Sequence, residues 1–347
     1  MKTIGVIGTA KNTGKTTTLS FLLNYFISQG QKVAVTGIGY DGEELDNITN
    51  LPKPRLHFEK GSVLATSEKC LYNTDASFEI IAETSFSTAL GKIILVRIIK
   101  SGQVVIAGPN KVKSLIKILK IIKDESGSDI VLIDGSLNRL SPMYILDKLI
   151  LTTGASRNTN IDDLVKEIQL FEKLFSYGIN HSNIFDENKI IVFNSSDSKI
   201  VETNTLIDEN DFQLLIKELS NNVQKIYFGG IISTEYLTKN LDRLLKIFTE
   251  RIEIVFKSPI QLLLTDNFIM LNQLLSLFER HEVKISYRYK PELSAVTINP
   301  FYPKHDNFRY IPSYLDKDIL IKSMKDYLNT HVFNILESDS KKIFELL

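Results

Sequence analysis

A Gly-Lys-Thr-Thr run near the N-terminus, Gly14–Thr17, has the residue types that bind a triphosphate. Such a ligand needs several backbone N–H groups, an ammonium group and a hydroxyl group that helps to hold magnesium. Gly14 lets the backbone approach the phosphates, and Lys15 is long enough to reach the β- and γ-phosphates. Thr16 offers a hydroxyl ligand for magnesium, and Thr17 lies where its hydroxyl can meet the α-phosphate. The run therefore predicts a phosphate-binding loop, with a glycine turn and a solvated lysine as the plain alternative.

The expected contacts with the nucleotide extend along the whole loop that precedes this run. Its members are Gly8, Thr9, Lys11, Asn12, Thr13, Gly14, Lys15, Thr16 and Thr17. Lys15 is also expected to take part in catalysis, because its charge faces the phosphates that react.

A second strong signal is Asp134, which follows the apolar run Ile130–Ile133. An all-apolar strand that ends in a carboxylate is typical of the Walker B arrangement, in which the acid lies at the magnesium edge of the sheet. Asp134 is therefore a predicted magnesium ligand and catalytic residue. Asn138 and Arg139 follow in a loop. Arg139 is either an electrostatic clamp on the γ-phosphate or a surface arginine.

Two acids also follow the apolar run Val33–Val35, in a turn rich in glycine. Ligands of parallel α/β sheets lie at the carboxyl ends of the strands. An acid in this turn could hold magnesium or orient an attacking water, with Asp41 as the first choice and Glu43 as the second. The alternative is a solvated turn.

The elements that must position these residues can be traced from the apolar pattern. Ile4–Ile7 forms a short apolar strand, and a helix with one apolar face follows the loop. The residues of that face are Leu19, Leu22, Leu23, Phe26 and Ile27. Gly30 ends the helix, and the next strand begins at Val33. This βαβ unit predicts a mostly parallel α/β sheet.

Short apolar strands dominate residues 55–107, which we expect to form a β-rich insertion between the second and third strands of the sheet. After about residue 200, strands and helices alternate again and predict a second, smaller α/β unit. The expected division is a nucleotide-binding domain over residues 1–200 and a C-terminal unit over residues 201–347.

Composition narrows the possible partners and the compartment. The 41 Lys and Arg residues balance the 41 Asp and Glu residues, so no overall basic field attracts nucleic acid or an anionic membrane. No apolar run approaches the roughly 20 residues of a membrane span. Cys70 is the only cysteine, which excludes an internal disulfide and favours a reducing cytoplasm. We interpret the N-terminal segment as a core strand rather than a signal peptide.

The loop resembles that of dethiobiotin synthetase and of the cobyric-acid amide synthetases, which are P-loop NTPases of the SIMIBI class. The resemblance covers the loop and the order of elements after it. One departure is that Gly8 lies one residue before the usual position of the first glycine, where Thr9 stands instead. The resemblance implies an ATP or GTP ligand, Mg²⁺ and an acid after the second strand. It also implies that Asn194, which follows the strand Lys189–Phe193, reads the base; a simple strand-end cap is the alternative.

Several further segments resemble a narrower family, associated with adenosylcobalamin-dependent lysine and ornithine aminomutases. These segments are Asp41–Glu43, Pro52–Arg55, Ala107–Pro109, Asp134–Arg139, Thr153–Ala155 and Ile298–Pro300. Its members look like reactivase components, which would use nucleotide energy to exchange a damaged cobalamin. This resemblance implies a protein partner rather than a metabolite.

Three functions are consistent with these features. The first is a Mg²⁺-dependent NTPase, with ATP as the first candidate nucleotide, whose hydrolysis drives a conformational change in a protein partner, for which an aminomutase is the candidate. The second is an ATP-dependent ligase or kinase of the dethiobiotin synthetase type. The third is a nucleotide-binding regulator with little turnover. We expect a cytoplasmic protein that binds neither nucleic acid nor membranes, with a homodimer as a candidate assembly.

Overall fold

The computed structural model divides the chain into two compact units. It describes residues 1–39, 56–72, 74–136, 141–182, 184, 186–195, 197–248, 251–264, 267–306 and 309–347. Unit 1 contains Met1–Glu172 and Pro291–Leu347, and unit 2 contains Lys173–Lys290. The sequence placed a single boundary near residue 200. The structure instead inserts unit 2 into unit 1, because the chain returns to the first sheet after Lys290.

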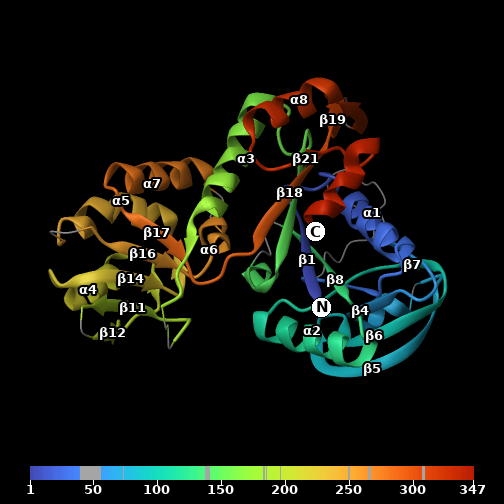
Figure 1. The fold of residues 1–347 in the computed structure, drawn as a ribbon, viewed down its shortest axis with the longest axis horizontal. Coiled ribbons are helices and arrows are strands. Elements are labelled where there is room, and N and C mark those ends of the chain that lie inside the picture. The colour runs from blue at the N-terminus through green and yellow to red at the C-terminus, as the bar shows by residue number, and fades with distance from the viewer. Residues whose placement is uncertain are drawn as a thin grey trace. The chain divides into compact units, whose positions relative to one another are not determined.

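Unit 1 is built on a nine-stranded sheet with the order β21-β18-β9-β1-β8-β2-β4-β6-β5 (Figure 1). The strands are β1 (Lys2–Gly8), β2 (Val33–Gly37), β4 (Val63–Ser67), β5 (Ser77–Thr88), β6 (Gly91–Lys100), β8 (Ile130–Ser136), β9 (Lys148–Gly154), β18 (Glu292–Asn299) and β21 (Val332–Phe333). Neighbours from β21 to β4 pair in parallel, and β6 is antiparallel to both β4 and β5. The predicted α/β fold with a mostly parallel sheet is confirmed.

The central strands are buried along almost their whole length. Thr3–Gly8 of β1, all of β2 and Leu149–Gly154 of β9 are buried. This burial explains why these strands read as continuous apolar runs rather than as alternating ones, since helices and loops cover both faces of a parallel sheet. Because these strands are parallel, the polar residues that follow them lie at the same edge of the sheet, the edge formed by the carboxyl ends of the strands.

The helices of unit 1 bury one apolar face each. They are α1 (Lys15–Ser28), α2 (Val112–Ser126), α3 (Ile161–Ser176), which runs into unit 2, and α8 (Lys317–Tyr327), with short 3₁₀ segments at Glu68–Leu71, Ser141–Ile145 and Ser338–Leu346. The buried residues of α1 include Leu19, Leu22, Leu23 and Phe26, as the spacing predicted. Phe344 of the last 3₁₀ segment stacks on Tyr25 of α1.

The predicted β-rich segment is present, and three of its strands extend the main sheet. β4, β6 and β5 follow β2 at one edge of that sheet. β3 (Leu56–Phe58) pairs separately with β7 (Gly102–Val104). The segment is therefore continuous with the core of unit 1.

The C-terminal strand β18 belongs to unit 1, whereas the sequence assigned its residues to the second unit. It pairs in parallel with β9, two strands from β1. A two-stranded antiparallel hairpin of β19 (Phe301–Asp306) and β20 (Arg309–Tyr314) follows directly. The chain order of the strands did not reveal this pairing, because 118 residues of unit 2 separate β18 from the rest of unit 1.

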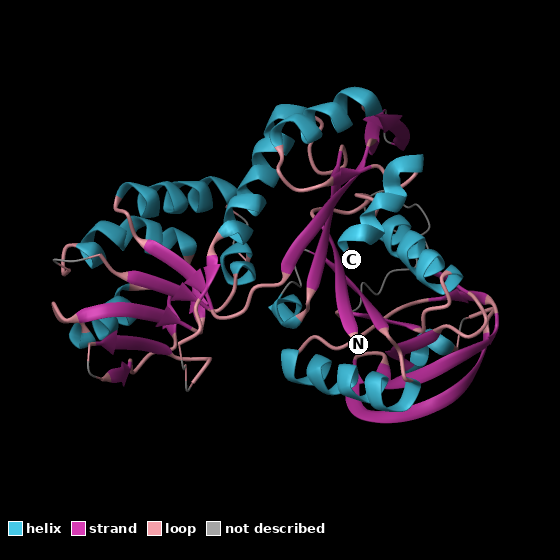
Figure 2. Ribbon diagram, viewed as in Figure 1, coloured by secondary structure: helices cyan, strands magenta, loops and turns pink. Residues whose placement is uncertain are grey.

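Unit 2 is the predicted smaller α/β unit, built on a six-stranded sheet with the order β10-β17-β16-β14-β11-β12. Its elements are β10 (Gly178–Ile179), β11 (Ile190–Asn194), β12 (Ser198–Ile200), β13 (Thr205–Leu206), α4 (Glu209–Glu218), β14 (Val223–Phe228), β15 (Ile231–Ile232), α5 (Thr234–Leu245), β16 (Glu253–Phe256), α6 (Pro259–Leu263), α7 (Phe268–Arg280) and β17 (Lys284–Tyr287). β10, β17, β16 and β14 pair in parallel, and β11 is antiparallel to β14 and β12. Helices α5 and α7 contact each other beside the sheet (Figure 2).

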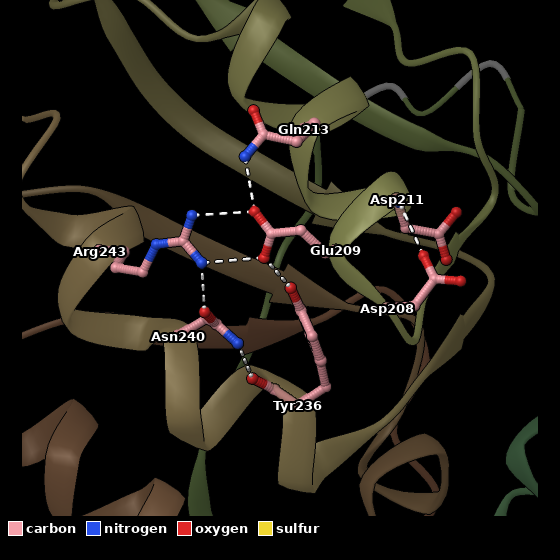
Figure 3. Close-up of polar contacts among 7 residues, drawn as sticks. All are labelled: Asp208, Glu209, Asp211, Gln213, Tyr236, Asn240 and Arg243. Atoms are coloured by element: carbon pink, nitrogen blue, oxygen red, sulfur yellow. Dashed lines mark hydrogen bonds and ion pairs between the residues drawn. The ribbon is translucent and has the colours of Figure 1, made fainter.

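A polar cluster joins the start of α4 to α5 (Figure 3). Both carboxylate oxygens of Glu209 accept hydrogen bonds from Arg243, at 2.9 and 3.0 Å. Gln213 and Tyr236 donate to the same carboxylate. Hydrogen bonds from Arg243, Gln213 and Tyr236 lower the pKa of Glu209 to about 2.

Within the described ranges, no helix combines the length and apolarity needed to cross a bilayer.

Candidate functional site

The loop between β1 and α1 contains two residues in the left-handed backbone region. Asn12 has a φ of 62° and Gly14 has a φ of 90°. Glycine adopts this region without strain and asparagine tolerates it better than most residues. Left-handed residues of this kind occur in the concave backbone nests that bind anions. Gly14 is also the N-cap of α1, and the first turn of α1 contains no acidic residue. The positive end of the helix dipole therefore meets no negative side chain there.

Threonine hydroxyls fasten the loop to the end of β9. The Thr9 hydroxyl donates to the Thr153 hydroxyl at 3.0 Å, and the Thr9 N–H donates to the Thr152 carbonyl oxygen at 3.0 Å. The Thr13 and Thr152 hydroxyl oxygens lie 3.0 Å apart. These four threonines are buried. The side chains of Thr9 and Thr13, which the sequence suggested as nucleotide contacts, are thus engaged with the scaffold, and so is the Thr9 N–H.

Gly8 has a packing role in the same loop. A Cβ at Gly8 would lie 2.9 Å from the Thr13 hydroxyl oxygen and 3.3 Å from that of Thr152. The glycine therefore makes room for the threonine contacts. This accounts for its position one residue before the usual first glycine of a phosphate loop.

Lys15 and Asp134 converge from neighbouring elements. Lys15 opens α1, and Asp134 lies on β8 opposite Val6 of β1. The Lys15 Nζ and Asp134 Oδ1 atoms are 3.1 Å apart, and both side chains are about three-quarters buried, at 23% and 27% exposure. The pair meets the distance of an ion pair but not the angles of a hydrogen bond. Asp134 Oδ1 is buried and accepts no hydrogen bond from any described residue.

This carboxylate fits a magnesium ion. A buried anionic oxygen is costly unless a cation or water meets it, and here the Lys15 ammonium is the cation that does so. Magnesium is usually held by one or two carboxylates together with phosphate oxygens and water. No group of three or more His, Cys, Asp or Glu side chains in metal-binding positions occurs within the described ranges. Thr16, the predicted hydroxyl ligand, is half-buried at the start of α1.

The remaining predicted loop residues lie toward solvent. Lys11 and Asn12 are exposed in the loop, and Thr17 is exposed in the first turn of α1. Asp41 and Glu43, predicted for magnesium or water, lie outside the described residues, as do Asn138 and Arg139.

Asn194 is not in the unit that carries the loop. It ends β11 of unit 2, a strand antiparallel to β14 and β12. Its side-chain amide donates to Asp197 Oδ1 at 2.7 Å. The prediction rested on a strand in the same parallel sheet as the loop. In unit 1 the strand that follows β9 in the sheet order is β18, so the residue at the corresponding strand end belongs to β18.

Asn299 ends β18, and sequence reasoning gave it no role. Its side-chain N–H donates to the Asn12 carbonyl oxygen at 2.8 Å, and its Oδ1 accepts from the Phe301 N–H at 3.1 Å. A Cβ at Gly14 would lie 3.4 Å from the Asn299 Cβ. The available signal was the Asn-Pro pair after a buried strand. It could not be interpreted without knowing that β18 returns to the first sheet.

Comparisons with known proteins add little to this geometry. No family model matches the chain, and no curated protein matches it. One solved structure that the search found is entitled "Structure of pNOB8 ParA bound to nonspecific DNA". It is 14% identical, with a TM-score of 0.27, over 62% of this chain and 73% of that one. At this TM-score the likeness supports no conclusion about activity or partners.

Proposed function

We propose that unit 1 binds a nucleoside triphosphate, with ATP as the first candidate, together with Mg²⁺ at the carboxyl edge of its sheet, and hydrolyses it. The observation that carries this proposal is the ion pair between Lys15 Nζ and a buried carboxylate oxygen of Asp134, 3.1 Å away, which accepts no hydrogen bond from the described residues. A lysine at the start of a helix and an acid at the end of the adjacent strand are the charges that a polyphosphate and its cation require.

Each residue has a distinct part in the proposed chemistry. The loop backbone and the start of α1 bind the phosphate oxygens, and the Lys15 ammonium neutralises charge on the β- and γ-phosphates. Asp134 Oδ1 and the Thr16 hydroxyl hold the metal. Bound Mg²⁺ would offset charge on the same phosphates. Asp41, or Glu43 in its place, is proposed to orient the attacking water.

The finer proposal is that hydrolysis changes the conformation of a protein partner. The resemblance to the aminomutase-associated family suggests an aminomutase, and the single cysteine suggests a cytoplasmic setting. The alternative, an ATP-dependent ligase or kinase, needs a second anion pocket. Its candidates Lys53 and Arg55 lie outside the described residues.

The first experiment measures nucleotide affinity by calorimetry for Lys15→Ala. Losing charge-assisted bonds to phosphate weakens binding by about 1.5–3 kcal/mol, or about 10- to 100-fold. Lys257→Ala in unit 2 is the matched control, because Lys257, like Lys15, is a half-buried lysine at the connection from a parallel strand to a helix. Retained affinity in Lys15→Ala, or an equal loss in Lys257→Ala, would mean that the loop is not the site.

A second variant, Asp134→Asn, separates the metal from the phosphates. The Mg²⁺ concentration needed for half-maximal binding should rise at least about tenfold, the range found even for residues that only support metal ligands. A Mg²⁺ titration of nucleotide binding, with EDTA as the zero point, gives this value. An unchanged Mg²⁺ requirement would remove Asp134 from the proposed metal site.

Hydrolysis rates then distinguish the candidate functions. A partner-driven NTPase turns over slowly alone and faster when an aminomutase is added. Equal rates with every partner, together with turnover that depends on a small carboxylate, would favour the ligase.

A further inference from the structure

The end of β18 is fixed firmly against β9. Asn299 pairs with Gly154, whose φ is 150°, and the Ala155 N–H donates to the Asn299 carbonyl oxygen at 3.0 Å. A Cβ at Gly154 would lie only 1.9 Å from that oxygen. Position 154 therefore requires glycine so that the two strand ends can approach each other. The pairing with β9 and the hydrogen bond from Ala155 hold the Asn299 backbone in place.

From this position the Asn299 side chain spans two segments that are far apart in the sequence. Its N–H group donates to the Asn12 carbonyl oxygen, in the loop, and its Oδ1 accepts from the Phe301 N–H, the first residue of the β19–β20 hairpin. A polar cap of the strand end explains the second bond, because asparagine commonly binds the N–H two residues ahead. It does not explain the first, which connects residues 287 positions apart.

The bond to Asn12 acts on the strained part of the loop. Asn12 is one of two non-glycine residues with a positive φ among those the structure describes. Such a conformation persists only when its surroundings fix it. The Asn299 N–H meets the carbonyl group of this residue and its Cβ faces Gly14, so Asn299 contacts the loop at both left-handed positions.

Among the residues that the structure describes, few hydrogen bonds anchor the hairpin at the other end of this connection. The Ser156 hydroxyl donates to the Phe301 carbonyl oxygen at 2.8 Å, and the Leu315 N–H donates to the Pro300 carbonyl oxygen at 2.9 Å. Beyond its base the hairpin is exposed over residues 304–306 and 309–310. Because so few of the described residues hold it, a change at Asn299 has a large relative effect on its order.

We propose that Asn299 is a positioning residue that couples the phosphate loop to the β19–β20 hairpin. Its side chain holds the loop in the nucleotide-binding shape, and a bound nucleotide, by fixing the loop, reduces the motion of the hairpin. Coupling between two sites is reciprocal, so whatever orders the hairpin also tightens nucleotide binding. The inference rests on the proposed nucleotide site and adds the part of unit 1 that responds to it.

The test combines nucleotide affinity with amide hydrogen exchange of residues 301–306 and 309–314, with and without nucleotide and Mg²⁺. Asn299→Leu is neutral, similar in size, and removes both side-chain bonds. We expect affinity to fall about fivefold, the effect of one net hydrogen bond, and the nucleotide-dependent protection of the hairpin to disappear. Ser156→Ala is the matched control, because it loosens the hairpin base without touching the loop. In that variant hairpin exchange rises but still responds to nucleotide.

Other outcomes separate this inference from the proposed function. If the unmodified protein binds nucleotide but Asn299→Leu has the same affinity, or keeps the nucleotide-dependent protection, the coupling is wrong and the nucleotide site stands. If the unmodified protein binds no nucleotide, both fail. Should Asn299→Leu not fold, Asn299→Asp keeps the acceptor for Phe301 and loses the donor to Asn12. It should therefore protect Phe301 as before while losing the response to nucleotide, and a preserved response would contradict the proposal.

Discussion

The loop after β1 in unit 1 and the turn after β14 in unit 2 use glycine in opposite ways. Gly14 adopts a φ of 90°, and a Cβ there would meet nothing closer than 3.4 Å. β14 is followed by Gly229 and Gly230, where a Cβ would lie 2.3 Å from the Glu187 carbonyl oxygen and 1.6 Å from that of Asn204. Glycine leaves open space at Gly14, whereas at Gly229 and Gly230 it makes room for the protein's own backbone, as it also does at Gly154 of unit 1.

Side chains reinforce this difference. Gln261 donates to the carbonyl oxygens of Phe228 and Gly230, and its Oε1 accepts from the Lys257 N–H at 2.8 Å. The turn after β14 is therefore closed by internal hydrogen bonds. In unit 1 the corresponding edge contains a buried carboxylate oxygen that accepts no hydrogen bond from the described residues. The turn after β14 is thus closed by hydrogen bonds of its own, whereas the loop of unit 1 lies beside a carboxylate oxygen that the Lys15 ammonium approaches without a hydrogen bond.

The largest expected effect is on the stability of unit 2. Gly230→Ala forces the new methyl group onto the Asn204 backbone and should lower the free energy of unfolding by about 3 kcal/mol or more. Urea unfolding measures the loss, and nucleotide affinity of the folded protein should not change. If the variant does not fold, Gln261→Ala tests the same turn, with a loss of about 1–3 kcal/mol from unsatisfied carbonyl groups. A stable Gly230→Ala protein with weakened nucleotide binding would contradict this comparison, because it would connect the turn after β14 with nucleotide binding rather than with stability.

An intermediate effect is expected in unit 1, on binding rather than folding. Gly14→Ala meets no clash, but its left-handed backbone costs about 1–2 kcal/mol, so the loop should relax and nucleotide affinity should fall about tenfold. Gly127→Ala is the control, because Gly127 has a φ of 62° in open space after α2. It should cost similar stability and leave affinity unchanged. Equal affinity in the two variants would show that Gly14 is only a helix cap.

The smallest effect concerns the Glu209 cluster of unit 2 and its dependence on pH. Bonds from Arg243, Gln213 and Tyr236 lower the pKa of Glu209 from 4.5 to about 2. A depressed carboxyl pKa stabilises the fold above the unfolded-state pKa, and this stabilisation disappears as pH falls from about 4.5 toward 2. The stability difference between the unmodified protein and Glu209→Gln should therefore be present at neutral pH and shrink below pH about 4.5.

Glu235→Gln provides the comparison for that measurement. Among the described residues Glu235 bonds only Lys239, on the surface of α5, where single ion pairs contribute little. Urea midpoints of the three proteins across this pH range give the result. A Glu209→Gln difference that is independent of pH, or no larger than that of Glu235→Gln, would show that the cluster is a solvated surface pair.

The sequence by itself determined the local chemistry of this protein. Short local patterns predict the loop, the helix that begins at Lys15 and the acid at the end of an apolar strand, because backbone preferences and apolar spacing act over a few positions. The mostly parallel sheet followed from the same patterns. The side-chain roles of Thr9 and Thr13 did not, because a hydroxyl in a loop fits a ligand or a neighbouring strand equally well.

Only the tertiary structure decided which distant strands share the edge with that loop. Asn194 and Asn299 both end apolar strands, and the proline that follows Asn299 does not say which sheet its strand joins. Strand pairing assigned the first to unit 2 and brought the second to Asn12, across 287 residues. Which strands become neighbours depends on the apolar surface that the whole chain buries, and this is a property of the assembled fold rather than of any segment.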